Sequence, residues 1–235
     1  MRILAIDTAL AACAVVLFDA ERDEMLARET MPMVRGHAEA LVPMIGRVMK
    51  AAGLLFPQID RVAVTVGPGS FTGLRVGISA ARGIALAAGK PAVGLSTLSA
   101  FAAPHVTTAS DTVILAAIDA AHGNAYFQIF GRRGRTLVTP RIAPLGEAAA
   151  AAVAAVRNRA GKTAEFLIVG SAAPLVAASW PAEAALPAVM QQGAPDIEWV
   201  ARLGAASQDA DTAPKPLYLR APDAKPQERS RLPRR

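Results

Sequence analysis

The stretch that decides the fold is RILAID, residues 2–7, because a close copy of it, TVILAAID, occupies residues 112–119. Both are short apolar runs that end in an acid, Asp7 or Asp119, a pattern typical of a buried strand. Each run is followed by a second strand, a turn and a third strand. We expect these at residues 12–19 and 24–30 in the first half, and at 124–130 and 136–141 in the second.

The rest of each half continues in parallel. A helix is predicted over residues 37–53, where apolar side chains recur at helical spacing before Gly53. Then come a strand (61–66), a glycine loop and a helix to about Ala88. In the second half a helix (about 145–160), a strand (165–169) and Gly170-Ser171 follow in the same order.

Three meandering strands followed by alternating helix and strand are the pattern of a ribonuclease H-like half. Two such halves in tandem build an α/β protein of the actin-like ATPase (ASKHA) class. We therefore expect a first half over residues 1–103 and a second half over residues 104–220. A basic and disordered tail is expected over residues 221–235.

The charge of the chain is modest, with a formal net charge of +6 over 235 residues. Much of the excess lies in the tail, at Lys225, Arg229, Arg231, Arg234 and Arg235. Such a tail attracts nucleic acid or an acidic protein surface, but it is also what a solvated terminus looks like. The charge alone does not define an RNA-binding protein.

The single cysteine, Cys13, excludes an internal disulfide and a cysteine metal cluster. Leu10-Ala11-Ala12-Cys13 resembles a lipoprotein cleavage site, but Asp7 interrupts the apolar run before it and the strand pattern continues beyond it. No apolar run is long enough to cross a membrane. We expect a cytoplasmic protein.

The sequence VTVGPGSFTGLRVG, residues 64–77, is the most informative motif. Its glycines let the backbone turn sharply off a strand, and the amides after them open a helix, which is a natural place for an anion. Ser70 or Thr72 could equally cap that helix. The loop matches neither a Walker A loop nor a dinucleotide fingerprint. The weak candidates for ligand binding are Asp7, Gly67, Gly69, Ser70 and Gly73.

The helix after this loop carries small residues every four positions, at Gly73, Gly77, Ala81 and Ala85. A stripe of small side chains lets another helix approach closely, either within the chain or across a subunit interface. Both alternatives stay open on spacing alone.

Five motifs in order along nearly the whole chain resemble the TsaB (YeaZ) family. They are ILAIDTA (3–9), GHAEALVP (36–43), VTVGPGSFTGLRVGISAARGIA (64–85), GLSTLSA (94–100) and PLYLRAPDAKP (216–226). The resemblance implies an actin-like fold shared with TsaD, the catalytic paralogue, and a part in making threonylcarbamoyladenosine in tRNA. It also implies TsaD and TsaE as partners, a homodimer when alone, and contact with tRNA through the complex.

The catalytic paralogues hold a metal with a His-x-x-x-His pair, and Thr97 and Phe101 occupy the two matching positions here. The three histidines, His37, His105 and His122, include no helical neighbours. We therefore expect no catalytic residue, no metal and no cofactor held by this chain alone. A nucleotide is expected, if anywhere, at a junction with partner subunits.

The remaining polar residues leave one enzymatic alternative, a degenerate actin-like ATPase or transferase that binds nucleotide weakly through Asp7, the 67–73 loop and Asp119. His37, close to Glu39, is expected to be a residue of the helix start. A metalloprotease is disfavoured for want of a histidine pair. The leading hypothesis is an interaction subunit whose helices 37–53 and 72–88 contact TsaD or a second copy. The residues predicted for that contact are Leu41, Ile45, Val48, Gly73, Leu74, Gly77, Ile78, Ala81 and Ala85.

Overall fold

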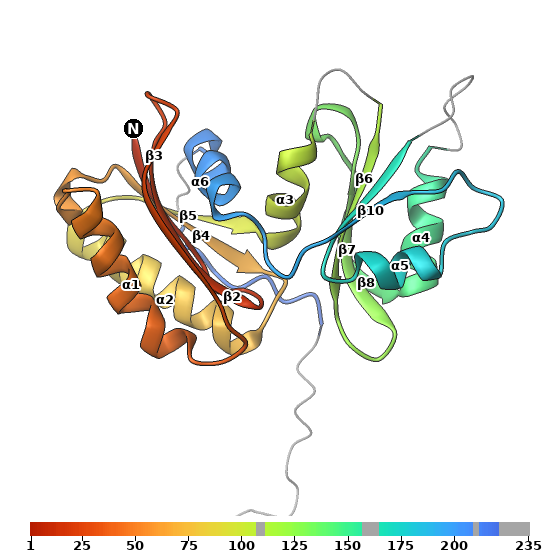
Figure 1. Ribbon diagram of the computed structural model, residues 1–235, viewed down its shortest axis with the longest axis horizontal. Coiled ribbons are helices and arrows are strands. Elements are labelled where there is room, and N and C mark those ends of the chain that lie inside the picture. Colours follow the sequence, from red (N-terminus) through yellow and green to blue (C-terminus); the bar gives the residue numbers. More distant parts are fainter. Residues whose placement is uncertain (107–110, 157–164, 209–211, 221–235) are drawn as a thin grey trace, which may run out of the picture.

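The computed structural model describes residues 1–106, 111–156, 165–208 and 212–220, which form two halves, each built on a five-stranded mixed sheet (Figure 1). The α/β class and the tandem arrangement of ribonuclease H-like halves predicted from the sequence are confirmed, and the protein has the actin-like fold. Residues 157–160 of the predicted helix and the tail from residue 221 lie outside the described ranges.

The first sheet has the order β3-β2-β1-β4-β5. Its strands are β1 (Arg2–Asp7), β2 (Ala12–Asp19), β3 (Glu24–Pro32), β4 (Arg61–Gly67) and β5 (Ala92–Ser96). β1, β2 and β3 are antiparallel neighbours, whereas β4 and β5 run parallel to β1. β2 is buried along its whole length, since both faces of this sheet are covered.

The second sheet repeats this order as β8-β7-β6-β9-β10. Its strands are β6 (Val113–Asp119), β7 (Asn124–Phe130), β8 (Thr136–Pro144), β9 (Phe166–Gly170) and β10 (Ala188–Gln191). The internal repeat is thus confirmed strand by strand. β10 was not predicted, because it is only four residues long, has no buried residue and lies in a proline-rich stretch that obscures its pattern.

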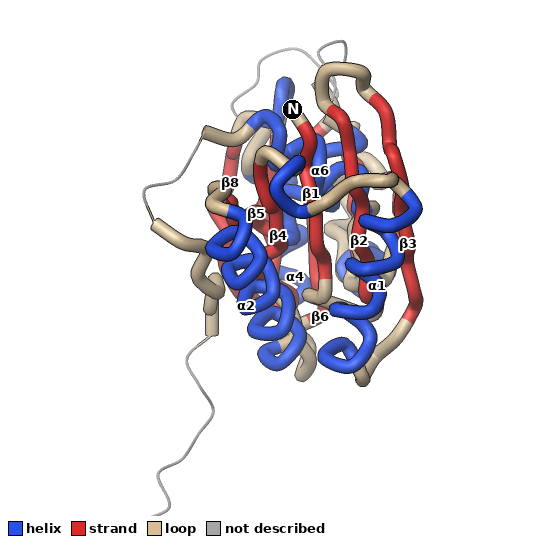
Figure 2. Tube along the Cα trace, turned by 90° about the vertical axis from the view of Figure 1, so that its left-hand side faces the viewer, coloured by secondary structure: helices blue, strands red, loops and turns tan. Residues whose placement is uncertain are grey.

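Two helices cover the outer face of each sheet. They are α1 (His37–Ala51) and α2 (Phe71–Ala88) on the first, and α4 (Leu145–Ala154) and α5 (Ala173–Ala178) on the second. Figure 2 shows α1 and α2 side by side across the first sheet. α2 begins at Ser70, whose hydroxyl accepts the Gly73 N–H, and ends at Gly89, which adopts a left-handed conformation (φ 64°). Among the described residues there are also short 3-10 turns at Phe56–Gln58, Ala103–His105 and Arg132–Gly134.

The inner face of each sheet is covered by a helix that follows the other sheet in the sequence. α3 (Thr97–Ala102) packs Leu98 and Phe101 against the second sheet. α6 (Ile197–Ala206), which lies at the end of the chain, packs on the first sheet (Figure 1). The boundary predicted near residue 104 is therefore wrong for the packing, because residues 197–206 belong to the core of the first half.

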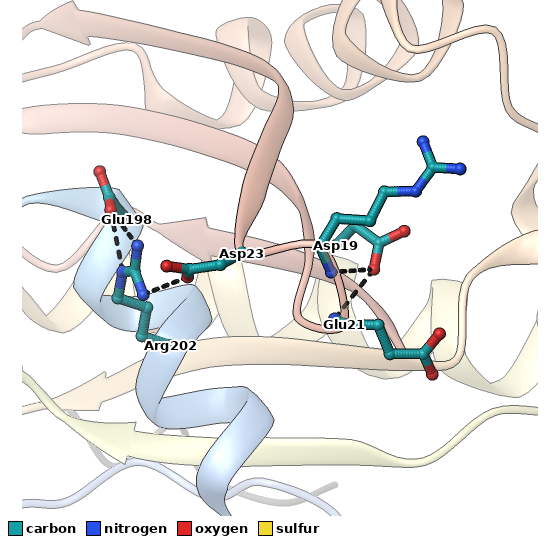
Figure 3. A network of polar contacts seen from close by, with 6 residues as sticks. Asp19, Glu21, Asp23, Glu198 and Arg202 are labelled. Atoms are coloured by element: carbon teal, nitrogen blue, oxygen red, sulfur yellow. Dashed lines mark hydrogen bonds and ion pairs between the residues drawn. The ribbon is translucent and has the colours of Figure 1, made fainter.

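Charged side chains fix α6 in this place. The Arg61 guanidinium on β4 donates to the carbonyl oxygens of Gly204 and Ser207, both at 2.6 Å. Arg202 pairs with Glu198 in its own helix and with Asp23 in the turn between β2 and β3 (Figure 3). In the part of the chain that the structure describes, no helix combines the length and apolar character needed to span a bilayer.

Candidate functional site

The glycine loop between β4 and α2 lies against the turn that joins β1 to β2. A Cβ atom added to Gly69 would lie 2.4 Å from the carbonyl oxygen of Ala9, and one added to Gly73 would lie 2.1 Å from that of Thr8. Neither distance is compatible with a side chain. These two glycines are therefore required by close packing within the chain.

Hydrogen bonds join the same two segments. The Ser70 N–H donates to the Ala9 carbonyl at 2.7 Å, and the Thr8 hydroxyl donates to the Gly73 carbonyl at 2.7 Å. The Ser70 hydroxyl accepts the Gly73 N–H at 3.3 Å. Of the two roles considered for this motif, the one that the structure contains is a capped helix start held on the β1–β2 turn.

Asp7 lies directly below this contact and is completely buried. One carboxylate oxygen accepts the Thr65 hydroxyl and the Ala9 N–H, and the other has no hydrogen-bond partner among the described residues. Burial raises the pKa of the carboxyl above its usual 3.8, and the bonds from Thr65 and Ala9 and the charge of His37 oppose that rise.

Asp119 holds the equivalent strand end in the second half but is exposed, and its carboxylate accepts the Ala121 N–H at 2.8 Å. Paired carboxylate chemistry would need Asp7 and Asp119 to reach one ligand. The structure places Asp7 in the core, bonded to Thr65 and Ala9, and Asp119 on the surface, bonded to Ala121.

A groove of about 370 Å³ is where most of the other polar candidates meet. It lies between the first turns of α1 and α2 and is lined by Arg35, His37, Glu39, Ser70 and Thr72, among others. The His37 ring is buried, and its Nε2 lies 3.2 Å from the Leu10 carbonyl oxygen. This contact ties the start of α1 to the β1–β2 turn, as expected of a helix-start residue.

Thr97 and Phe101, which the family resemblance predicts to match the two histidine positions of the catalytic paralogues, are both fully buried. Phe101 packs among Leu98, Ile114 and Ile118 between α3 and the second sheet. The structured ranges contain no group of three His, Cys, Asp or Glu side chains that could hold a metal ion.

The residues predicted for the partner contact are in the core, and this prediction is wrong as a description of the surface. All nine are buried under α1 and α2: Leu41, Ile45, Val48, Gly73, Leu74, Gly77, Ile78, Ala81 and Ala85. The stripe of small residues fits α2 against Thr8, since a Cβ on Gly77 would lie 2.4 Å from the Thr8 hydroxyl oxygen. What the two helices expose is a different set.

A part of the exposed side of the two helices, formed by Val42, Gly46, Ser79, Gly83 and Leu86, is named here the outer helix surface. Val42 is 67% exposed and Leu86 is 85% exposed. A Cβ added to Gly46 or to Gly83 would meet nothing within 4 Å, so these glycines are not required by packing within the chain. Helical periodicity could have identified this set, because its residues lie on the side of each helix opposite the apolar stripe.

Sequence reasoning also missed a surface cluster at the start of α2, formed by Phe71, Arg75 and Tyr218. Tyr218 belongs to the PLYLR motif, which was quoted for the family resemblance without a role. The segment that carries it returns to the first half through a hydrogen bond from the Leu217 N–H to the Val66 carbonyl at 2.7 Å.

Comparison with known proteins identifies the class of protein to which this fold belongs. Residues 31–220 match the family model of TsaD, tRNA N6-adenosine threonylcarbamoyltransferase. A solved structure described as YeaZ from Pseudomonas aeruginosa covers 93% of this chain and 99% of its own, with a TM-score of 0.72 and 24% sequence identity. The chain thus has the fold of the TsaD-related proteins.

Relatives in sequence identify the family within this class. The chain is 39% identical over 132 residues to the tRNA threonylcarbamoyladenosine biosynthesis protein TsaB of Escherichia coli (strain K12), an alignment covering 56% of either chain. It is 36% identical over 130 residues to the Haemophilus influenzae protein of the same name, covering 54% of this chain and 52% of that one. The chain spans about half the length of these two relatives. An uncharacterized protein of Mycobacterium tuberculosis (strain ATCC 25618 / H37Rv) is 31% identical over 224 residues, covering 95% and 94% of the two chains. The chain belongs to the TsaB (YeaZ) family.

Proposed function

We propose that this chain is a non-catalytic, cytoplasmic subunit of the machinery that makes threonylcarbamoyladenosine in tRNA, and that it acts by binding TsaD, the catalytic subunit, together with TsaE. The observation that carries the proposal is the burial of the residues that would serve an enzyme of this fold. Asp7 is sealed in the core, and the glycine loop is packed on Thr8 and Ala9. Thr97 and Phe101 are core residues in place of metal ligands.

The outer helix surface is the contact that we propose for TsaD, and for a second copy of this chain when TsaD is absent. Gly46 and Gly83 leave room above the two helices, and Val42 and Leu86 add apolar area beside them. Helices pack most closely where small residues face each other, so a modest area of this kind supports a specific contact. Small and apolar residues on paired helices thus remain the basis of the interface, on the opposite face from the one predicted.

The groove between the first turns of α1 and α2 borders this surface. It brings Arg35, Ser70 and Thr72 to the edge of the proposed subunit junction. A nucleotide bound at that junction would contact this groove, which is consistent with the expectation that any nucleotide requires a partner subunit. Loss of nucleotide from the complex on replacing Arg35 with alanine would test this assignment.

Formation of threonylcarbamoyladenosine on a tRNA transcript tests the function directly. TsaD and TsaE from the same organism are supplied with a threonylcarbamoyl donor, with and without this chain, and the modified nucleoside is measured by mass spectrometry. We expect product only when the chain is present, and none from the chain alone. Product from the chain without TsaD would establish the enzymatic alternative instead. Equal product without the chain would show that it is not a required subunit.

A further inference from the structure

A cluster of exposed rings lies where the described chain ends. Phe71 and Tyr218 are stacked with ring centroids 5.6 Å apart and an interplanar angle of 29°, yet they remain 53% and 48% exposed. The Arg75 guanidinium lies 3.6 Å from the centroid of the Phe71 ring, and its Nε donates to the Tyr218 hydroxyl at 3.2 Å. We call these three residues the aromatic cluster.

The rings are not the main anchor of the segment 212–220. The Leu217 N–H is bonded to Val66, and Pro214 is buried against Gly94, where an added Cβ would lie 3.3 Å away. These contacts hold the segment on the first half whatever side chain stands at position 218. The exposed stack therefore needs a reason other than the attachment of the C-terminal segment.

Cations flank this cluster along the two segments that form it. Neither α2 nor the segment 212–220 contains an aspartate or glutamate, and together they carry Arg75, Arg82, Lys215 and Arg220. Arg82 lies seven residues from Arg75, about 10 Å along the helix. The two described segments that carry the aromatic cluster thus hold four cations and no acidic residue.

We propose that the aromatic cluster and the cations around it bind single-stranded RNA, with nucleobases extending the ring stack and phosphates lying along the cations. This is the combination by which proteins hold unpaired RNA loops, since every base has a face to stack and every nucleotide carries a charge. The assignment of the RNA to a tRNA loop rests on the proposed function, whereas the surface itself does not.

This surface adjoins the one proposed for TsaD along α2. Phe71 and Arg75 lie in the first turns of the helix, whereas Gly83 lies eight residues beyond Arg75, about 12 Å along the axis. Arg82 and Leu86 stand at i and i+4, so Arg82 lies at the border of the two surfaces. The start of the helix would then contact the RNA and its end the catalytic subunit.

Fluorescence anisotropy with the full chain and a labelled 17-nucleotide anticodon stem-loop tests this proposal, with an RNA duplex of the same length as the competing ligand. The double variant Phe71→Leu with Tyr218→Leu keeps apolar side chains but removes the stacking faces. We expect it to weaken stem-loop binding about tenfold or more, since one stacked base accounts for that much. Arg75→Gln should lower the slope of log affinity against log salt by about one. Phe56→Leu, at an aromatic residue of the same half that is 39% exposed, is the matched control and should bind as the wild type does.

Three results would overturn the proposal. They are no binding by the wild-type chain, equal binding by the double leucine variant whose thermal melting is unchanged, and no preference for the stem-loop over the duplex. Loss of TsaD association by the double variant with RNA affinity intact would assign the cluster to a protein contact instead. Gly83→Arg should lose TsaD and keep RNA, so failure of the proposed function and failure of this inference are distinguishable.

Discussion

Thr8 and Gly73 touch at two points: the Thr8 hydroxyl donates to the Gly73 carbonyl at 2.7 Å, and the Thr8 carbonyl occupies the space of a Cβ at position 73. Thr8, in the turn after β1, and Gly73, at the start of α2, are 65 residues apart in sequence. In this contact the glycine motif serves as internal packing. The stability of the fold should therefore depend on it.

Gly73→Ala should destabilise the protein strongly, because the new methyl group would lie 2.1 Å from the Thr8 carbonyl oxygen in a tightly bonded turn. We expect a loss of about 3 kcal/mol in the free energy of unfolding, measured by urea denaturation. Gly83→Ala, in the same helix with open space around it, should instead gain up to about 1 kcal/mol. Similar losses in both variants would contradict this assignment of the loop.

Asp7→Asn should change the pH dependence of stability. Burial raises the pKa of the folded-state carboxyl above 3.8, so the folded state favours the protonated form. The stability that Asp7 contributes is complete below its unfolded pKa and is lost as the pH rises through the raised folded pKa. Asparagine does not ionise, so the variant should gain stability relative to the wild type as the pH rises through that window. Parallel urea titrations from pH 4 to 8 measure the difference, and a difference that falls with pH would contradict a buried acid.

Cys13 should be unreactive in the folded protein. Its thiol is buried, and burial, followed by the nearby Asp7 and Glu29 carboxylates, raises its pKa to about 11. Because it is the only cysteine, labelling by a chromogenic disulfide reagent at pH 8 reports on this position alone. We expect slow reaction limited by unfolding, and fast stoichiometric reaction in denaturant. Fast labelling of the native chain would show that β2 is accessible.

Arg61→Met should release α6 from the first sheet. The buried guanidinium donates to two carbonyls at the end of α6, and its charge is favourable at a helix C-terminus. We expect the free energy of unfolding to fall by about 3 kcal/mol. Hydrogen exchange should become faster in residues 197–206, and by more than in the rest of the chain. Arg28→Met on the exposed part of β3 is the control and should stay within about 0.5 kcal/mol. Unchanged exchange in α6 would argue against this anchor.

The duplicated sheets could be predicted because their signal is local. Apolar runs that end in Asp7 and Asp119, and the short turns that follow them, repeat with the same spacing. The packing of α6 on the other half could not be read this way, since the sequence does not say which sheet covers a helix. Its existence could have been found, because Asp196 caps a run with Ile197, Val200 and Ala201 at helical spacing.

The candidate site was predicted less well than the fold. Small residues at Gly73 and Gly77 are compatible with a subunit contact or with internal packing, and only the position of Thr8 decides between them. The partner residues were chosen from the apolar stripe, which is the face that the chain itself buries. The aromatic cluster joins Phe71 to Tyr218, which are 147 positions apart in sequence, a contact that no local pattern indicates.

The most direct test of the central claim is whether this chain forms a complex with TsaD through the outer helix surface. Size-exclusion chromatography with light scattering, on the chain alone and mixed with the TsaD of the same organism, gives the masses of the species. Ala81→Arg would not test this surface, since Ala81 is fully buried. Gly83→Arg places a large side chain on the surface, and Gly146→Arg on α4 makes the same change where an added Cβ also meets nothing within 4 Å. The account predicts a heterodimer that Gly83→Arg abolishes and Gly146→Arg preserves. A complex that survives Gly83→Arg, or no complex with the wild-type chain, would contradict it.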